Sequence, residues 1–336
     1  MLSGNNPLSR PLAGIFSLAG PTLNENEKAL FAQAKPLGFI LFQRNIENAA
    51  QLGNLVNEIR SCVGWHCPVL IDQEGGRVAR LREPDWPEFP PARHFGKLME
   101  TDETTATLKL KEATSQTSYM LSQAGINVNC TPVLDRLCSQ TVKAIGDRAY
   151  SADNKTIIKC ADIVCRTYLE HHIIPVIKHM PGHGRAVVDS HETLPIINEG
   201  KDELLRTDFN IFARIAQSDF KDYMWGMTGH ILFPCLDKDR PASVSKKVIK
   251  ELIRETLGFS GFLISDDIDM KGLAQFGDVE KRSLLALKAG TDAVLYCSGA
   301  FEDMKKLENS LPELSDESWS RFALSYQEDI NSGPKA

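Results

Sequence analysis

Short apolar runs alternate with amphipathic segments from one end of the chain to the other. Each run has the length of a buried strand and is bounded by polar or turn-forming residues. Eight such runs are found, at residues 14–18, 38–42, 68–71, 126–129, 173–177, 223–227, 261–265 and 293–297. The pattern therefore predicts eight strands that are separated by helices.

Two of the segments between the predicted strands show the helical period clearly. Between residues 157 and 169, apolar side chains recur so that they form one face of a helix. The segment 248–257 has a similar face, with Ser245 placed to cap its first turn and Gly258 placed to end it. Both helices are expected to pack this apolar face against a sheet.

Strands that alternate with helices pair in parallel through right-handed crossovers. Eight such units close most economically into a TIM-type (β/α)8 barrel, so we predict an α/β fold in one domain spanning residues 1–336. An open, doubly wound sheet is the alternative. The proline-rich stretch 83–96 is predicted to be a surface excursion that becomes helical near Thr101, and the polar tail from about residue 327 is expected to be frayed.

Composition narrows the class of protein. The formal net charge is −6 without a basic run, which argues against nucleic acid and anionic membranes as partners. Residues 1–10 lack the pattern of a signal peptide, and no apolar run approaches the roughly 18 residues that cross a bilayer. The eight cysteines are scattered without a CxxC pair, which is typical of reduced thiols. We therefore expect a cytoplasmic protein with no membrane partner.

Ionisable residues gather after three of the predicted strands, at the end of a parallel barrel where active sites lie. Lys178 and His179 follow the fifth strand, and a loop rich in proline and glycine then leads to Asp189 and His191. Residues i and i+2 of an extended backbone point the same way, so the Asp189 carboxylate can orient the His191 imidazole and raise its basicity. A solvated loop that happens to carry these side chains is the alternative.

The other two strand ends carry carboxylates. Asp72 and Arg80 flank a Gly-Gly turn after the third strand, and they either bind sugar hydroxyls or form an ion pair with each other. Asp266 and Asp267 follow the seventh strand, and each either caps the next helix or acts as a carboxylate nucleophile. The spacing does not say which of these two aspartates faces the mouth of the barrel.

Two further residues and one loop have open interpretations. Arg148, after the fourth strand, either contacts a ligand or pairs with the adjacent Asp147, and His230 either contacts a ligand or is a satisfied histidine of the barrel rim. Gly182 and Gly184 are expected to give the loop before His191 the freedom to swing, so that His191 is displaced until a ligand binds.

Three of these segments together resemble the bacterial β-N-acetylglucosaminidases of glycoside hydrolase family 3. That family shows a V/I-D-Q-E-G-G-R-V-x-R segment, a K-H-F-P-G-H-G…D-S-H loop and an S-D-D stretch, which match residues Ile71–Arg80, Lys178–His191 and Ser265–Asp267. The resemblance covers nearly the whole chain, in order. Two departures stand out: Met180 replaces an aromatic or aliphatic residue, and Arg185-Ala186 stands where many relatives have Asp-Thr.

The resemblance implies a retaining, two-step hydrolysis that releases terminal N-acetylglucosamine from muropeptides during cytoplasmic cell-wall recycling. Asp266 would be the nucleophile, and His191 would be the general acid and then the base, with Asp189 as its partner. The residues that would hold the N-acetylglucosamine are Asp72, Arg80, Arg148, Lys178 and His179. No metal or cofactor is implied, because His191 takes the place of the second carboxyl group of most retaining glycosidases.

Three other functions stay open at this point. A metal-dependent barrel hydrolase would use His179, His183 and His191 with an aspartate, although the spacings of four and eight fall on a glycine-rich loop rather than on a helix. A phosphorylase of the same family would use phosphate instead of water in the second step. A sugar-binding protein without activity is disfavoured by the complete set of reacting groups. The sequence also leaves the aglycone and the oligomeric state open.

Overall fold

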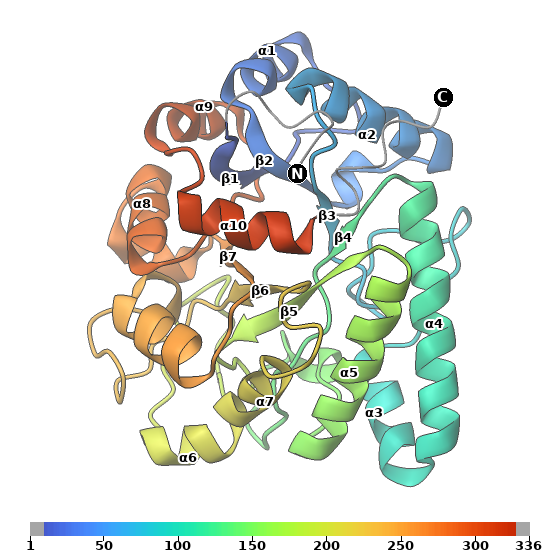
Figure 1. Ribbon diagram of the computed structural model, residues 1–336, viewed down its shortest axis with the longest axis vertical. Coiled ribbons are helices and arrows are strands. Elements are labelled where there is room, and N and C mark those ends of the chain that lie inside the picture. Colours follow the sequence, from blue (N-terminus) through green and yellow to red (C-terminus); the bar gives the residue numbers. More distant parts are fainter. Residues whose placement is uncertain (1–9, 327–336) are drawn as a thin grey trace.

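The computed structural model describes residues 10–326, and in this range the chain forms a closed barrel of eight parallel strands (Figure 1). The strands are β1 (Leu12–Phe16), β2 (Pro36–Leu41), β3 (Val69–Ile71), β4 (Val128–Asn129), β5 (Ile174–Met180), β6 (Trp225–Thr228), β7 (Phe262–Asp267) and β8 (Ala293–Leu295). Neighbours in the sequence are neighbours in the sheet, and the pair Gly14 and Val294 joins β1 to β8. The predicted barrel is confirmed, and the open sheet is excluded.

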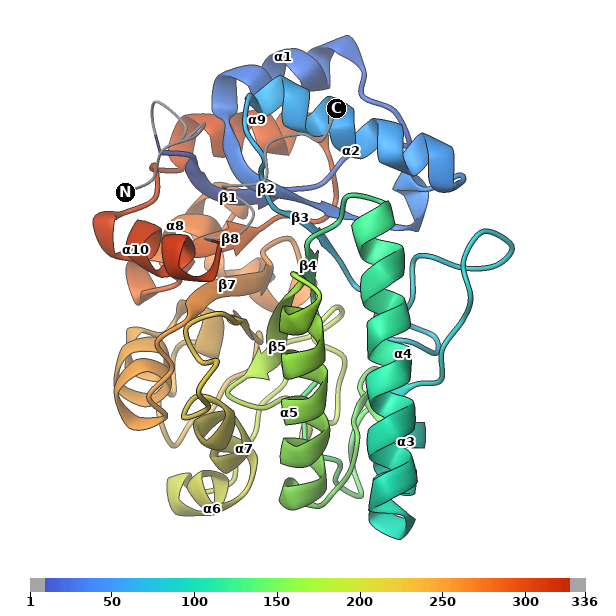
Figure 2. The ribbon, with the colours of Figure 1, turned by 45° about the vertical axis from the view of Figure 1, so that its right-hand side comes forward.

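Helices surround this barrel on its outside (Figures 1 and 2). The α-helices of the described range are α1 (Glu25–Ala34), α2 (Ala49–Val63), α3 (Ala92–Thr101), α4 (Glu103–Gln123), α5 (Asn154–Glu170), α6 (Lys201–Arg206), α7 (Asp208–Ile215), α8 (Val279–Ala289), α9 (Phe301–Ser310) and α10 (Asp316–Ser325). A π-helix spans Lys247–Thr256, and short 3-10 turns span Gln43–Asn45, Gly146–Arg148, Ala242–Val244 and Lys271–Phe276. Within residues 10–326 no helix is long and apolar enough to cross a membrane.

The helix expected after Ser245 is present, with its predicted ends. The Ser245 hydroxyl accepts the backbone N–H of Val248 at 3.2 Å, and Gly258 lies in the left-handed region with a φ of 76°. Ser245 thus caps the first turn of the helix, and Gly258 ends it. Its winding as a π-helix is a feature that the apolar period did not predict.

The proline-rich stretch after β3 differs in part from its prediction. Residues 83–91 form the expected irregular excursion, but α3 already begins at Ala92 instead of near Thr101. Pro91 precedes the first turn, where the missing N–H costs nothing because first-turn amides have no partner inside the helix. The buried face of this helix includes Phe95 and Met99. The predicted fraying from about residue 327 falls outside the described residues.

Two strands are longer than their apolar runs. β5 continues to Met180, and β7 continues to Asp267, so that both strands carry ionisable residues close to their C-terminal ends. Lys178 is only 1% exposed and His179 is 6% exposed, because both belong to the strand instead of the loop after it. The barrel therefore holds these charged groups rigidly at its C-terminal end.

An aromatic cluster closes the opposite end of the barrel. Phe322 of α10 packs against Trp225 and Phe262, the first residues of β6 and β7, with ring centroids 6.0 Å and 5.7 Å away. Trp225 also donates its indole N–H to the hydroxyl of Ser325 at 2.8 Å. These contacts bury the apolar face of α10 against the N-terminal ends of the strands.

Phe322→Ala should lower the free energy of unfolding by about 3–5 kcal/mol, because it removes a fully buried ring and leaves a cavity. Leu324→Ala on the same helix is the control. Its side chain is 46% exposed, so the change should stay within about 0.5 kcal/mol. Urea unfolding followed by circular dichroism measures both variants. Equal losses in the two variants would contradict the packing described for α10.

Candidate active site

A cavity of about 260 Å³ opens at the C-terminal ends of the strands. This is the end of a parallel barrel where catalytic residues are usually found. All eight residues predicted for the site line this cavity, namely Asp72, Arg80, Arg148, Lys178, His179, Asp189, His191 and Asp266. The structure therefore brings the three sequence segments together, while the roles of the residues stay predictions.

Asp72 lies between two cations. Its Oδ1 accepts from Nζ of Lys178 at 2.7 Å, and its Oδ2 accepts from the guanidinium of Arg80 at 3.2 Å. Burial opposes the ionisation of Asp72, but the charges of Lys178 and Arg80 outweigh it and lower the pKa of the carboxyl. Asp72 and Arg80 therefore form the ion pair that was one interpretation, and they line the cavity as the other interpretation required.

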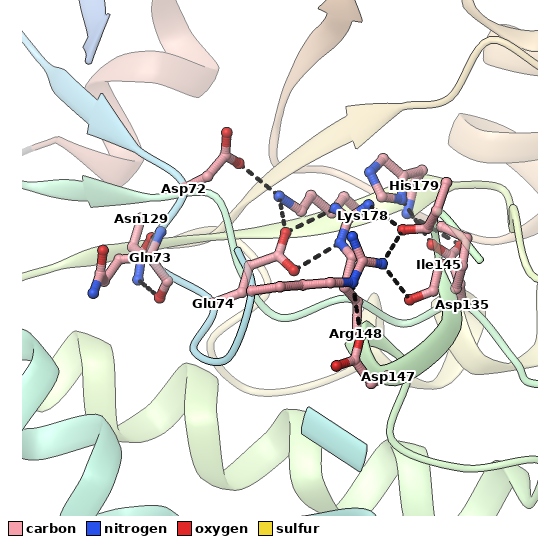
Figure 3. Close-up of polar contacts among 12 residues, drawn as sticks. Asp72, Gln73, Glu74, Asn129, Asp135, Ile145, Asp147, Arg148, Lys178 and His179 are labelled. Carbon is pink, nitrogen blue, oxygen red and sulfur yellow. Dashed lines mark hydrogen bonds and ion pairs between the residues drawn. The ribbon is translucent and has the colours of Figure 1, made fainter. Parts of the chain in front are cut away.

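Glu74 completes the network and was missed by the sequence analysis. Its Oε1 lies 2.6 Å from Nζ of Lys178, and both of its carboxylate oxygens accept from Arg148 at 2.8 Å (Figure 3). Burial would raise the pKa of Glu74, yet the charges of Arg148 and Lys178 lower it to about 2. The signal was available, because Glu74 stands two residues after Asp72 in the same segment and an extended backbone places such residues on one side.

Arg148 is thus the partner of Glu74 and not of its neighbour in the sequence. Asp147 instead accepts from Nε of Arg77 at 2.9 Å. The bidentate contact with Glu74 fixes the plane of the Arg148 guanidinium. Arg148 still lines the cavity, so its predicted contact with a ligand stays possible.

His179 is oriented by Asp135, a second residue that the sequence analysis missed. Its Nδ1 lies 2.7 Å from Oδ2 of Asp135, whose other oxygen accepts the backbone N–H of His183 at 2.6 Å. Burial lowers the pKa of His183 to about 4, so this imidazole is neutral, and its Nε2 lies 3.0 Å from the hydroxyl of Ser190. His183 thus has a structural position behind the cavity.

This arrangement bears on the alternative of a metal-dependent hydrolase. His179 is engaged by Asp135, and His183 is turned towards Ser190, so these histidines do not converge with His191 on one point. Among residues 10–326 there is no group of three His, Cys, Asp or Glu side chains arranged to hold a metal ion. That hydrolysis proceeds without a metal remains a prediction.

The carboxyl groups of Asp266 and Asp267 have different environments. Asp266 lines the cavity and accepts the backbone N–H of Asp267 at 2.8 Å. Burial would raise its pKa, but the attraction of His179 and His230 outweighs burial and lowers the pKa. Asp266 is therefore ionised at neutral pH.

Asp267 shows the opposite behaviour. Its Oδ1 accepts the backbone N–H groups of Asp269 and Cys297, both at 3.1 Å, so this carboxyl holds the turn that follows β7. Burial nevertheless dominates and raises the pKa of Asp267 to about 6. Environments that separate the pKa values of two neighbouring carboxyls are a mark of divided roles. Both aspartates line the cavity, but Asp267 is engaged by two backbone N–H groups, which favours Asp266 as the carboxylate available to a ligand.

His230 is the satisfied histidine of the barrel rim. Its Nδ1 lies 2.7 Å from the hydroxyl of Ser243, and its Nε2 lies 2.8 Å from the backbone carbonyl of Asp267. The ring is fully buried, and burial lowers its pKa. Both nitrogens are thus occupied, which leaves His230 a supporting position beside Asp266.

Asp189 and His191 form the pair that their spacing predicts. Oδ1 of Asp189 lies 2.8 Å from Nδ1 of His191 and also accepts the backbone N–H of His191 at 3.0 Å. Burial would raise the pKa of Asp189, but these hydrogen bonds lower it. The carboxylate thus holds the proton on Nδ1 and leaves Nε2 to exchange a proton with a ligand. The His191 side chain is 67% exposed.

The glycines of this loop have a different purpose from the one expected. A Cβ atom on Gly184 would lie 1.8 Å from the carbonyl oxygen of Arg136, and Gly182 has a φ of 143° that only glycine adopts readily. These glycines permit a close approach and a tight bend. This packing is a reason for the glycines other than freedom to swing, and the displacement of His191 in the empty enzyme stays a prediction.

Fold and cavity together define a barrel enzyme whose site combines a buried carboxylate, a group of cations and a carboxylate–histidine pair. A family model described as the glycosyl hydrolase family 3 N terminal domain matches residues 13–323, and the chain belongs to this family. The resemblance seen in the three sequence segments is confirmed.

Individual relatives agree with this assignment. The beta-hexosaminidase of Methylobacillus flagellatus is 34% identical over 286 residues, which cover 85% of this chain and 80% of the relative. The structure of NagZ from Neisseria gonorrhoeae in complex with N-trifluoroacetyl-D-glucosamine has a TM-score of 0.85 and 27% identity, over 95% of this chain and 91% of that one. A family 3 β-N-acetylglucosaminidase from a Paenibacillus species has a TM-score of 0.86 and 26% identity, over 96% and 62%.

The raised pKa of Asp267 predicts a pH dependence of stability. The native state binds this proton up to about pH 6, whereas an unfolded aspartate loses it near about pH 4. Stability from this group therefore falls as pH rises through that window. Asp267→Asn removes the charge and keeps an oxygen for Asp269 and Cys297.

The variant should be more stable than the native protein at pH 7, by up to about 3 kcal/mol, and the gain should vanish below about pH 4. Urea unfolding of both proteins at several pH values measures the difference. A difference that does not change with pH would contradict the origin of the shift.

Proposed function

We propose that this glycoside hydrolase is a retaining β-N-acetylhexosaminidase that releases terminal N-acetylglucosamine by a double displacement. The observation that carries the proposal is that one cavity holds an ionised carboxylate, Asp266, and a proton-exchanging pair, Asp189 and His191. Further support comes from relatives that are beta-hexosaminidases and from a structural neighbour that binds N-trifluoroacetyl-D-glucosamine.

In the first step, Asp266 attacks the anomeric carbon while the bond to the leaving oxygen breaks. The proton on Nε2 of His191 goes to that oxygen, so the aglycone leaves as an alcohol. Asp189 lies 2.8 Å from Nδ1 of His191, so the proton that is transferred is the one on Nε2. The product of the step is a glycosyl ester on Asp266 and a neutral His191.

In the second step, a water molecule attacks the anomeric carbon and displaces the Asp266 carboxylate. Nε2 of His191 now takes a proton from that water, which restores the imidazolium and completes the cycle. The carbon is inverted twice, so the sugar leaves with the configuration it had in the substrate. A histidine suits both directions because its unperturbed pKa of about 6.5 lies near neutrality.

The charged network between β3 and β5 is proposed to hold the sugar. Asp72 is ionised and has lone pairs left beside its contacts with Lys178 and Arg80, so it can accept hydrogen bonds from two hydroxyl groups. Arg80, Arg148 and the His179 ring supply the remaining polar surface. Because ion pairs already fix these side chains, binding of the sugar costs little side-chain conformational entropy.

The natural substrate that we propose is a muropeptide with a terminal N-acetylglucosamine, processed in the cytoplasm during cell-wall recycling. The support for this substrate is the resemblance to the bacterial members of the family over nearly the whole chain. The proposed reaction involves only the sugar and its leaving oxygen. The chemistry of the site is therefore the same whichever group the sugar is attached to.

Asp266→Ala should keep the fold and lower turnover on the order of 10⁴-fold or more, because it removes the proposed nucleophile, while the Asp267 carboxylate is engaged by the backbone N–H groups of Asp269 and Cys297. Asp267→Asn is the matched control and should keep most of the activity. A fluorosugar that deglycosylates slowly should label the native protein, and mass spectrometry of the peptides locates the label. A label on Asp267 or Asp72 would overturn the assignment of the nucleophile.

His191→Ala should slow the hydrolysis of a natural disaccharide by about 10²–10⁴-fold, the usual contribution of a general acid. The first step with an aryl glycoside should be slowed much less, because that leaving group departs without a proton. Asp189→Ala should have the same pattern with smaller losses. The burst of aryl alcohol in stopped flow isolates the first step. Equal losses on both substrate types would exclude the acid role of His191.

A further inference from the structure

The loop that carries Asp189 and His191 is clamped on one side just before it reaches them. The backbone carbonyl of Gly184 accepts from the hydroxyl of Thr141 at 2.6 Å, and the carbonyl of Ala186 accepts the N–H of Val142 at 2.9 Å. Gly184 is also packed directly against the backbone of Arg136. Residues 184–186 are thus fixed to the segment that follows β4.

Arg185 clamps the same residues on the other side, to the segment around α6 and α7. Its Nε donates to Oδ2 of Asp208 at 2.7 Å, and its two terminal nitrogens lie 3.1 Å from Glu199 and 3.2 Å from Glu203. It also donates to the hydroxyl of Thr207 at 3.1 Å. The side chain is only 14% exposed, so screening by solvent is weak.

Asp208 makes this clamp difficult to open. Its side chain is 2% exposed, and Oδ1 has no hydrogen-bond partner among the described residues. The other oxygen accepts from Arg185 and from the hydroxyl of Thr207. Moving Arg185 away would leave a buried carboxylate without its cation, which is strongly unfavourable. The contact between Arg185 and Asp208 is therefore costly to break.

Beyond this clamp the loop is covered unevenly, because Ser190 is buried and its hydroxyl lies 3.0 Å from Nε2 of His183. Val187 is 55% exposed and the His191 side chain is 67% exposed. The four steps of backbone from Arg185 to Asp189 span at most about 14 Å. The position of Arg185, together with the contacts of Ser190, therefore limits where Asp189 and His191 can lie.

We propose that Arg185 is a positioning residue, which fixes the place at which the loop presents Nε2 of His191 to the leaving oxygen. The proposal rests on the acid–base role of His191 in the proposed function.

The test replaces Arg185 together with its buried partner. Arg185→Met alone leaves Asp208 buried without a cation, so the main variant is Arg185→Met with Asp208→Asn, which removes both charges. Turnover of a disaccharide should fall by about 10- to 100-fold, since a displacement of about 1 Å costs about 100-fold, while KM stays within about twofold. The burst with an aryl glycoside should change by less than about threefold. Arg185→Lys should restore part of the loss.

Arg166→Met is the matched control. Arg166 also bridges two carboxylates, Asp162 at 2.9 Å and Asp219 at 2.7 Å, but it does so on α5, outside the cavity. Its loss should leave turnover of both substrates unchanged. Thermal unfolding of every variant checks that the fold is kept.

The decisive comparison repeats the Arg185 and Asp208 changes in a His191→Ala background. If Arg185 acts through His191, the added changes should then cost less than about twofold on the disaccharide. An undiminished loss in that background, or no loss in the native background, would overturn the proposal while the acid role of His191 stands. Equal losses of both substrate types in His191→Ala alone would instead overturn the proposed function, and the proposal with it.

Discussion

The buried charge of Lys178 is the constraint on which the rest of the site depends. A lysine that is 1% exposed on a barrel strand is tolerable only when carboxylates surround it, and Asp72 and Glu74 do so at 2.7 Å and 2.6 Å. Burial alone would lower the pKa of Lys178, but these two charges outweigh burial and raise it. The ammonium therefore ties the end of β3 to β5.

The positions of other charged residues in the cavity depend on these contacts of Lys178. Glu74 is fixed by Lys178 and in turn fixes Arg148, which comes from the distant turn after β4. Asp72 is fixed in the same way and holds Arg80. The cations and carboxylates alternate, so that each charge is compensated before a ligand arrives. A polar ligand then meets groups that are already oriented.

The two groups that we propose to react, Asp266 and His191, lie at the edge of this rigid region and differ in how they are held. Asp266 belongs to β7 and is backed by the fully buried His230, so its position is set by the barrel. His191 belongs to an exposed loop and is held by Asp189. If Asp266 is the nucleophile and His191 the acid, as we propose, the rigid strand fixes the attack on the sugar and the loop can accept leaving groups of different shape.

Much of the fold could be predicted from the sequence because its signals are local. Apolar runs of strand length located the eight strands, and the bracketing of one helix by Ser245 and Gly258 was confirmed. The start of α3 at Ala92 was missed because the prolines before it dominate the local pattern. The extension of β5 through Lys178 was missed because charged residues break an apolar run, even when tertiary partners compensate their charge.

The site could be predicted only in part for a related reason. Residues such as Asp72 and Asp266 were found because they follow predicted strands, and the C-terminal ends of all strands of a parallel barrel lie on the same face. Glu74 and Asp135 were missed, because their importance comes from partners that are 74 and 44 residues away in the sequence. The difference between the pKa values of Asp266 and Asp267 depends on burial and on neighbouring histidines, and neither can be read from spacing.

The configuration of the first product tests the central claim, a double displacement at Asp266, most directly. Proton NMR during the cleavage of a β-N-acetylglucosaminide follows the anomeric signals before mutarotation mixes them. Two inversions at the same carbon predict that the β-anomer of N-acetylglucosamine appears first and that the α-anomer grows in later. An α-anomer as the first product would mean a single attack by water, and it would contradict the covalent role of Asp266.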